Sequence, residues 1–532
     1  MIKLPPFHFL LVAFFLFTAC DKIELEPGEE SGSGGFPGLN PATPCEVTGN
    51  GIAYNVGPGM TYEKIIDVPF EDLKPGDAVF IHAKSTPYHE RILLTRSGTA
   101  EYPICVCGVP DEQGNLPTLD GANARIRPPA DDVNSFLRDE LINYAMIVVA
   151  FNYGDYPAHL KIQNLRITGA NAHNESNPNQ YYVHGTDNLV TYSPGTSGIW
   201  MRGTDIEISN CIIEENGEGI FGAYNGPEQP LADIKLYNNI IRNNGEVGSF
   251  LRHNIYLEAD NLTVVGNQIG PTYPGSLGGN LKSRGAGDVI MYNKLVGPAL
   301  RHFDLVEAQN SYEWLAQKES FRNTYVVGNL VVGAEYGAGN ILHYGGDGDN
   351  TTPSDDLRQG TVYAYNNTFI LKGFYEGGNP NAEYRKSFMD LNTCNEKLYA
   401  FNNIFAYEYT GKGDQATNTL IHIFRLRGDV SEFSNNLVSE DTVSWYNDNT
   451  NGDPCNLNLD YGIIQASMAS VASMGFFDFS NGDYHLKSGS AAIGKGMEVP
   501  ANLPAVEYQF TMPNGIEKRT DGGLDIGAFE FK

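Results

Sequence analysis

Short runs of alternating apolar and polar residues recur along this chain, each with the length and composition of a β-strand. Asparagine marks the same point in eight successive groups of strands, at steps of 28, 29, 26, 36, 37, 36 and 33 residues. These residues are Asn210, Asn238, Asn267, Asn293, Asn329, Asn366, Asn402 and Asn435. A repeated unit that contains strands and no credible helix indicates stacked coils, and therefore predicts an all-β parallel β-helix.

Asparagine suits the corner of such a coil for two reasons. It tolerates the left-handed backbone of a sharp turn, and its side chain can hydrogen-bond from one coil to the next. We therefore expect all eight asparagines to form one ladder, with Asn164 as an earlier rung. Long inserts between coils should crowd one face, and they span residues 308–322, 345–359, 372–386 and 409–420.

The third strand of each unit carries most of the chemically active side chains. Strand alternation, with Ile199, Ile220, Ile255, Leu281 and Phe303 facing the core, points two columns outward. The first column holds Trp200, Phe221, Tyr256, Lys282 and Asp304, and the second holds Arg202, Ala223, Glu258, Arg284 and Val306. Coils lie roughly 4.8 Å apart, so each column should line one groove. The same alternation places His343 inward, as a core residue.

The N-terminus resembles a processing signal. Residues 1–19 contain Lys3 and a short apolar run, and Thr18-Ala19-Cys20 resembles the lipobox of bacterial lipoproteins. The resemblance implies cleavage before Cys20 and lipidation of its thiol; the alternative is ordinary secretion. Residues 20–44 form an acidic tether rich in Gly, Ser and Pro, and 45–532 a single β-helix domain that includes a closing segment. The expected location is the outer membrane, facing the cell surface or the periplasm.

The net charge limits the classes of binding partner, and the cysteine content allows disulfides. The 532 residues carry 35 Lys and Arg against 64 Asp and Glu, a net charge of −29, which argues against nucleic-acid binding. Six further cysteines could form disulfides whose pairing the sequence does not reveal: Cys45, Cys105, Cys107, Cys211, Cys394 and Cys455. Cys105 and Cys107 share one face of a strand and are expected to be buried thiols, as is Cys211.

Basic side chains nevertheless gather on three successive coils. They are Arg252, His253, Lys282, Arg284, Arg301 and His302. Arginine binds carboxylates in a bidentate manner, and aromatic rings such as Trp200 and Tyr256 stack on sugar rings. The pattern predicts an acidic polysaccharide as partner. The alternative is local salt bridging to Glu258, Asp304 and Glu307.

The stretch Lys282-Ser283, the strand from Asp288 to Asn293, and Arg301-His302 resemble the active-site region of polysaccharide lyase family six. That family contains chondroitinase B and alginate lyases, and the resemblance covers residues 46–310. It implies a right-handed parallel β-helix and β-elimination of a uronate, with Lys282 as base and Arg301 at the other side of the cleaved bond. Flanked by Arg284 and Arg301, Lys282 is expected to have a lowered pKa.

The resemblance also implies Ca²⁺, which in that family is held by acidic residues just before the lysine. Residues 276–280 carry no carboxylate here, so Glu258 and Asp304 become the candidate ligands, or Arg284 replaces the ion. Two alternatives remain: a glycoside hydrolase that uses Asp304, Glu258 and Glu307, and a non-catalytic glycan-binding or adhesion protein. The expected protein is a monomeric lipoprotein that cleaves an acidic polysaccharide by elimination.

Overall fold

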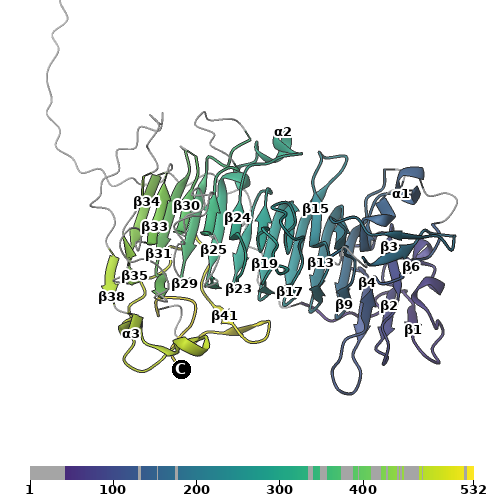
Figure 1. The fold of residues 1–532 in the computed structure, drawn as a ribbon, viewed down its shortest axis with the longest axis horizontal. Helices are drawn as coiled ribbons and strands as arrows, with labels where there is room; N and C mark the ends of the chain where they lie inside the picture. The colour runs from purple at the N-terminus through teal and green to yellow at the C-terminus, as the bar shows by residue number, and fades with distance from the viewer. Residues whose placement is uncertain are drawn as a thin grey trace, which may run out of the picture. The chain divides into compact units, whose positions relative to one another are not determined.

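Three long parallel sheets, each stacked from strands of successive coils, build the molecule (Figure 1). The computed structural model describes residues 42–532 apart from 130–133, 140, 153, 174–177, 334–339, 348–355, 373–386, 394, 409–420, 427–428, 440–441, 444–445, 448–465, 470 and 521–523. Neighbouring strands within a sheet come from successive coils and pair in parallel. The predicted all-β parallel β-helix is confirmed.

The first sheet has twelve strands. They are β1 (Ala53–Val56), β2 (Ala78–His82), β4 (Ile104–Val109), β8 (Ala158–Gln163), β13 (Gly203–Ser209), β16 (Leu231–Tyr237), β19 (Asp260–Val265), β22 (Val289–Met291), β25 (Asn323–Val327), β28 (Thr361–Tyr365), β31 (Lys397–Phe401) and β34 (Asp429–Ser434). The second sheet has eleven: β5 (Thr118–Asp120), β9 (Arg166–Thr168), β14 (Ile212–Glu214), β17 (Ile240–Arg242), β20 (Gln268–Ile269), β23 (Lys294–Val296), β26 (Leu330–Val332), β29 (Thr368–Lys372), β32 (Ile404–Glu408), β35 (Asn436–Ser439) and β38 (Ala466–Ala469).

The third sheet carries the candidate site and has thirteen strands. They are β6 (Arg125–Ile126), β3 (Glu90–Leu94), β7 (Ala145–Val149), β12 (Ser197–Met201), β15 (Glu218–Ala223), β18 (Ile255–Glu258), β21 (Leu281–Ser283), β24 (Arg301–Leu305), β27 (Asn340–Tyr344), β30 (Ser387–Leu391), β33 (Ile421–Leu426), β36 (Thr442–Val443) and β37 (Tyr446–Asn447). Three hairpins stand apart: β10 (Gln180–Tyr182) with β11 (Leu189–Thr191), β39 (Phe476–Asp478) with β40 (Asp483–Leu486), and β41 (Tyr508–Phe510) with β42 (Ile516–Lys518). Short helices are α1 (Ser135–Asp139), α2 (Tyr312–Leu315) and α3 (Val471–Met474).

Aliphatic and aromatic side chains from the three sheets fill the space that the coils enclose. Ile220, Ile255, Leu281 and Phe303 stand directly above one another in the third sheet, as predicted, and are fully buried. Burial of one such side chain is worth about 1.5–3 kcal/mol. The stack therefore fixes which face of each strand points outward. No helix among the described residues is long and apolar enough to cross a membrane.

The corner asparagines occupy two neighbouring columns, and the prediction of one ladder of eight is wrong. A buried ladder joins each side-chain amide to the next at 2.9–3.1 Å. Its rungs are Asn239, Asn267, Asn293, Asn329, Asn367, Asn403 and Asn436. The residue before each rung takes the left-handed conformation instead. This second column holds Asn238, Gly266, Tyr292, Gly328, Asn366, Asn402 and Asn435, and Asn164 and Asn210 take the same conformation on earlier coils. The left-handed turn and the coil-to-coil hydrogen bond at each corner are thus provided by two adjacent residues.

A C-terminal strap, residues 495–515, runs back along this corner. Asn435 donates to the carbonyl of Lys495 at 2.6 Å, and Asn402 donates to that of Met497 at 2.8 Å. Further along, Gly515 N donates to the carbonyl of Gly266 at 2.7 Å. The left-handed column therefore holds the strap against coils that lie far apart in the sequence.

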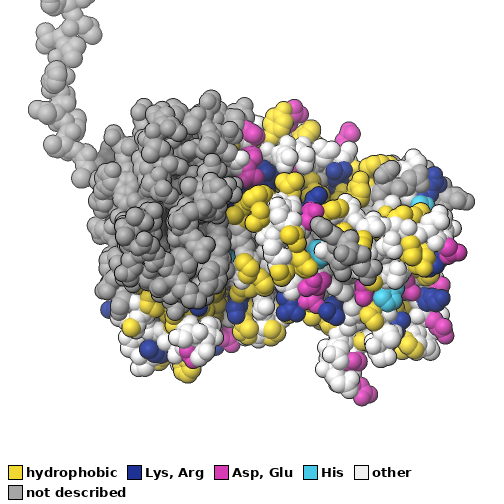
Figure 2. Space-filling model, in the orientation of Figure 1, with side chains coloured by type: hydrophobic (Ala, Val, Ile, Leu, Met, Phe, Trp, Pro, Cys, Tyr) yellow, Lys and Arg dark blue, Asp and Glu magenta, His cyan; other side chains and the backbone are white. Residues whose placement is uncertain are grey.

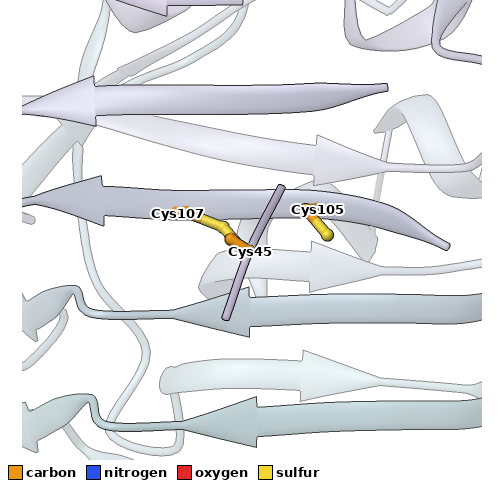
Figure 3. Close-up of side chains that lie close together, drawn as sticks. All are labelled: Cys45, Cys105 and Cys107. Carbon is orange, nitrogen blue, oxygen red and sulfur yellow. A yellow bond between two sulfur atoms is a disulfide. The ribbon is translucent and has the colours of Figure 1, made fainter. Parts of the chain in front are cut away.

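The cysteines follow the prediction only in part. Cys45 and Cys107 form a disulfide, which ties the start of the domain to β4 (Figure 3). The expected thiol at Cys107 is therefore wrong, because the segment that carries Cys45 folds back onto that strand. Cys105 and Cys211 are buried free thiols, as predicted. Cys394, Cys455, Cys20 and the predicted signal lie outside the described residues, as do the inserts 373–386 and 409–420.

Candidate functional site

The predicted first column is present on the third sheet. Trp200, Phe221, Tyr256, Lys282 and Asp304 are directly paired from β12 to β24. The column continues into β27, where His343 pairs with Asp304. The predicted inward orientation of His343 is therefore wrong. In β27 it is Leu342 that stacks on Phe303 of the core, so the next residue faces the column.

A charged cluster forms at the centre of this column, and we define it as Lys282, Arg284, Arg301, Asp304, Glu307, His343 and Asp347. Lys282 Nζ lies 2.8 Å from Asp304 Oδ2 and 2.5 Å from Asp347 Oδ2. Arg301 Nη1 lies 2.8 Å from Asp304 Oδ1 and 2.8 Å from Asp347 Oδ1. Three strands and the loop after β27 supply the groups, so residues far apart in sequence meet within a few ångströms.

Arg284 forms the outer side of the cluster. Its Nη2 lies 2.7 Å from Asp347 Oδ2, and its Nη1 lies 2.9 Å from Glu307 Oε1. Its Nε donates to the hydroxyl of Tyr256 at 3.0 Å, and that hydroxyl donates to Gln309 at 2.9 Å. The predicted residues Lys282, Arg284, Arg301 and Tyr256 therefore lie in one place.

The carboxylates decide the proton affinities in the cluster. Burial tends to lower the pKa of Lys282, but Asp304 and Asp347 outweigh it, and the net shift is upward. The predicted lowering is wrong because the sequence pattern pointed to the flanking arginines and not to Asp347. Burial raises the pKa of Asp304, yet Arg301 and Lys282 bring it well below the usual value. At neutral pH Lys282 is therefore an ammonium, and Asp304 and Asp347 are ionised carboxylates.

Asp304 is the hub of the cluster. Besides Lys282 and Arg301, it bonds His343, whose Nδ1 lies 2.7 Å from Asp304 Oδ1. Among the described residues, His343 Nε2 and Arg301 Nε are buried and have no hydrogen-bond partner. Two polar groups beside the carboxylates thus have no partner in the part of the chain that the structure describes.

A buried ion pair supports the strand that carries Lys282. Arg358 Nη2 lies 3.0 Å from Asp288 Oδ2, and both side chains are fully buried. Arg358 Nε donates to the carbonyl of Val306 at 2.8 Å, and Ser283 Oγ donates to Asp288 at 2.9 Å. This pair fixes the backbone on both sides of the cluster. Sequence reasoning missed Asp347 and Arg358, which belong to an insert without repeat periodicity.

Three ligand atoms in the cluster, one each from Asp304, His343 and Asp347, lie within 4.8 Å of one another and could hold a metal ion. Their carboxylate oxygens already bind Lys282 and Arg301, which repel a cation. Ca²⁺ prefers six to eight oxygen ligands. The set offers two carboxylates and a nitrogen, so it does not fit Ca²⁺ in this arrangement.

Glu258, the other predicted metal ligand, lies elsewhere. Its carboxylate accepts hydrogen bonds from the backbone of Gln309, Asn310 and Ser311 and from the Ser311 hydroxyl, and it is fully buried. It fixes the start of the insert over the site. Its oxygens do not face the charged cluster.

The predicted histidines support the backbone. His253 Nδ1 accepts from Gly279 N at 2.8 Å, and His302 Nδ1 lies 3.0 Å from the amide nitrogen of Asn280. Burial lowers the pKa of each imidazole to about 3, and Lys282 adds to the effect at His253. Both rings are therefore neutral, and the His253 ring lies 5.5 Å from that of Tyr256.

Trp200 and Arg202 lie at the far end of the column, three strands from Lys282. Trp200 is buried in a small apolar group beside α1, with its ring 6.4 Å from that of Tyr144. Arg202 donates to Gln229 at 2.6 Å. The structure does not bring these two residues to the charged cluster.

Arg252 is paired with a buried carboxyl, at 3.8 Å from Glu218 Oε2. Burial raises the pKa of Glu218 from 4.5 to about 8. Between these two pH values the folded state holds a proton that the unfolded chain has released, so stability falls as pH rises through that range.

Glu218→Gln is therefore expected to raise the melting temperature more at about pH 9 than at about pH 5, with a gain on the order of 1–3 kcal/mol at the higher pH. Glutamine keeps the shape and never ionises. Thermal melts across the pH range provide the measurement. A gain that is largest in acid would contradict the assignment.

An open cleft of about 750 Å³ adjoins the cluster. It is lined by Arg284, Glu307, Ala308, Gln309, Tyr312, Asp347 and Asp356. Basic and acidic side chains are mixed over the face shown in Figure 2, without a broad patch of one sign.

No protein-family profile matches the chain, and no curated protein matches it in sequence. Solved structures that resemble it include the PL6 family alginate lyase AlyGC, at 12% identity and a TM-score of 0.40, over 79% of this chain and 53% of that chain. Pectate lyase Pel9A is 13% identical with a TM-score of 0.33, over 91% of this chain and 98% of that chain. The GH136 lacto-N-biosidase from Eubacterium ramulus is 11% identical with a TM-score of 0.37, over 73% of this chain and 67% of that chain. The match spans about half of AlyGC. The likeness concerns the fold alone.

Proposed function

We propose that this protein binds a uronate-containing polysaccharide in the cleft beside the charged cluster and cleaves it by β-elimination. One observation carries the proposal: Lys282, Arg284 and Arg301 converge on a single carboxylate, that of Asp347. Two guanidinium groups and an ammonium around one point form a receptor for a carboxylate. A uronate offers such a carboxylate in every acidic sugar unit.

This arrangement supports elimination. Arg284 and Arg301 would bind the uronate carboxylate and withdraw charge from it, which acidifies the proton on the neighbouring carbon, C5. Neutral Lys282 would take that proton, the C5 electron pair would form the C4–C5 double bond, and the bond from C4 to the glycosidic oxygen would break. The leaving oxygen would then take a proton from the Lys282 ammonium. Because the pKa of Lys282 is raised, kcat/KM should increase with pH into the alkaline range.

Hydrolysis is less well supported. A glycosidase needs one carboxyl group that stays protonated to act as general acid. Lys282 helps keep the pKa of Asp304 and of Asp347 below the usual value, against the opposing effect of burial. Glu258, the second candidate, is saturated with hydrogen bonds, and Glu307, the third, is paired with Arg284. No step in the proposed reaction requires Ca²⁺, since Arg284 and Arg301 carry the positive charge.

Incubation with alginate, chondroitin, dermatan, pectate and a neutral glycan tests the proposal, with and without a chelator and added Ca²⁺. Unsaturated products, detected by their ultraviolet absorbance, are the expected result for at least one uronate polymer. New reducing ends without unsaturation would support a hydrolase instead. Retention of a polymer without products would indicate a glycan-binding protein.

We also propose that the chain is a monomeric lipoprotein anchored to the outer membrane through Cys20, on the strength of the lipobox-like sequence. Cys20→Ser is expected to move the protein from the membrane fraction to the soluble fraction, with an unchanged melting temperature. The tether separates Cys20 from the domain, so the fold should not respond. A protein that stays in the membrane fraction would contradict the anchor.

A further inference from the structure

Asp347 is an acidic side chain that is bound by three basic side chains, although basic residues are the minority in this protein. Its Oδ2 lies 2.5 Å from Lys282 Nζ and 2.7 Å from Arg284 Nη2, and its Oδ1 lies 2.8 Å from Arg301 Nη1. Both carboxylate oxygens are thus bound by three cations that come from two successive coils. Asp347 also borders the 750 Å³ cleft, so the bound carboxylate lies at its wall.

We propose that Asp347 occupies the carboxylate subsite of the cleft and is displaced when the carboxylate of a uronate ligand binds. The choice of a uronate rests on the proposed function. The geometry of the subsite does not, because any carboxylate that bridges the same three cations would make the same hydrogen bonds.

The charges around the subsite make Asp347 and a ligand carboxylate compete for it. With Asp347 in place, three cations face three carboxylates, those of Asp304, Glu307 and Asp347. A fourth carboxylate would meet like charges at short range, and such close pairs are strongly unfavourable when partly buried. A ligand carboxylate that replaces Asp347 keeps the balance.

Two further observations favour a ligand at this position. Arg301 Nε is a buried donor without an acceptor among the described residues, and it belongs to the guanidinium that binds Asp347. The backbone of Asp347 is tied to the cluster by a hydrogen bond in which its N–H donates to Glu307 Oε2 at 2.7 Å. Its side chain is 27% exposed, whereas that of Lys282 is 8% exposed. The resident carboxylate is thus the most accessible member of the three-cation site.

The test measures binding of D-glucuronate and of a uronate oligomer to the full chain by calorimetry. Asp347→Asn removes the competing charge and is expected to lower the Kd for both probes by about tenfold or more, as for any site freed from a competing state. Glu313→Gln is the matched control, because Glu313 is exposed on α2 nearby and contacts Tyr312 rather than the cluster. It removes the same charge and should change Kd by less than about twofold.

An equal gain in both variants would reduce the effect to net charge and overturn the proposal, as would an unchanged or higher Kd in Asp347→Asn. Asp347→Ala serves as a second variant, and thermal melts identify any variant that fails to fold. The pH dependence gives an independent readout: loss of Asp347 should move the rise of kcat/KM with pH to lower pH, since one carboxylate that raises the pKa of Lys282 is gone. If no polymer is cleaved while Asp347→Asn still binds glucuronate more tightly, the proposed reaction fails and the subsite stands.

Discussion

Lys282→Ala is expected to abolish turnover, with a decrease in kcat of about 10²–10⁴-fold, while binding of the polymer is largely kept. Lys282 is the one group of the three-cation site that can lose a proton, because the other two are guanidinium groups. The substitution leaves Asp304 bonded to Arg301 and His343, so the buried carboxylate does not become unpaired. Steady-state kinetics beside calorimetric binding separates the two effects.

Lys282→Arg provides the control for charge. It keeps the positive charge but does not release its proton at working pH, so it should fail as completely as alanine. Arg301→Ala, in contrast, should weaken binding and rate together. Full activity in Lys282→Ala would remove the lysine from the mechanism, and His343 would then be the group to examine, since its Nε2 is without a partner among the described residues.

The second large effect is expected in stability. Arg358→Met should decrease the free energy of unfolding by about 3–5 kcal/mol, because Asp288 is left as an unpaired buried charge. The methionine also loses the hydrogen bond to the carbonyl of Val306. Urea unfolding monitored by circular dichroism gives the measurement.

The double variant Arg358→Met with Asp288→Asn tests the cause. It removes the orphaned charge, so it should recover a substantial part of the loss. If the double variant is as unstable as Arg358→Met, then packing of the long side chain, and not the charge pair, accounts for the effect. Activity should fall with stability in the single variant, since the pair supports both Ser283 and Val306.

Features that repeat with the coil could be predicted from the sequence. The core stack and the outward column from Trp200 to Asp304 follow from strand alternation, and the structure has both. The asparagine columns were merged because four of the eight coils carry a pair of asparagines in which either member could serve as the rung. Only three-dimensional pairing separates the left-handed residue from its hydrogen-bonded neighbour.

Features carried by the inserts could not be predicted. Asp347 meets Lys282 from 65 residues away, and Arg358 meets Asp288 from 70 residues away. Neither insert residue occupies a repeated position, so periodicity says nothing about its location. The raised pKa of Lys282 depends on Asp304, which lies in the predicted column, and on Asp347, which the sequence did not place there. The positions of the cations were thus predicted correctly, but the direction of the pKa shift of Lys282 was not.

The C-terminal strap changes how the coils depend on one another. In a simple solenoid each coil touches only its neighbours, so the ends can fray one coil at a time. Here residues 495–515 contact Asn435 and Asn402 at one end of their path and Gly266 at the other. Peeling the last coils away therefore also breaks contacts to coils near the middle of the chain. The strap therefore couples distant coils: unfolding of the terminal coils also removes contacts that stabilise the central coils.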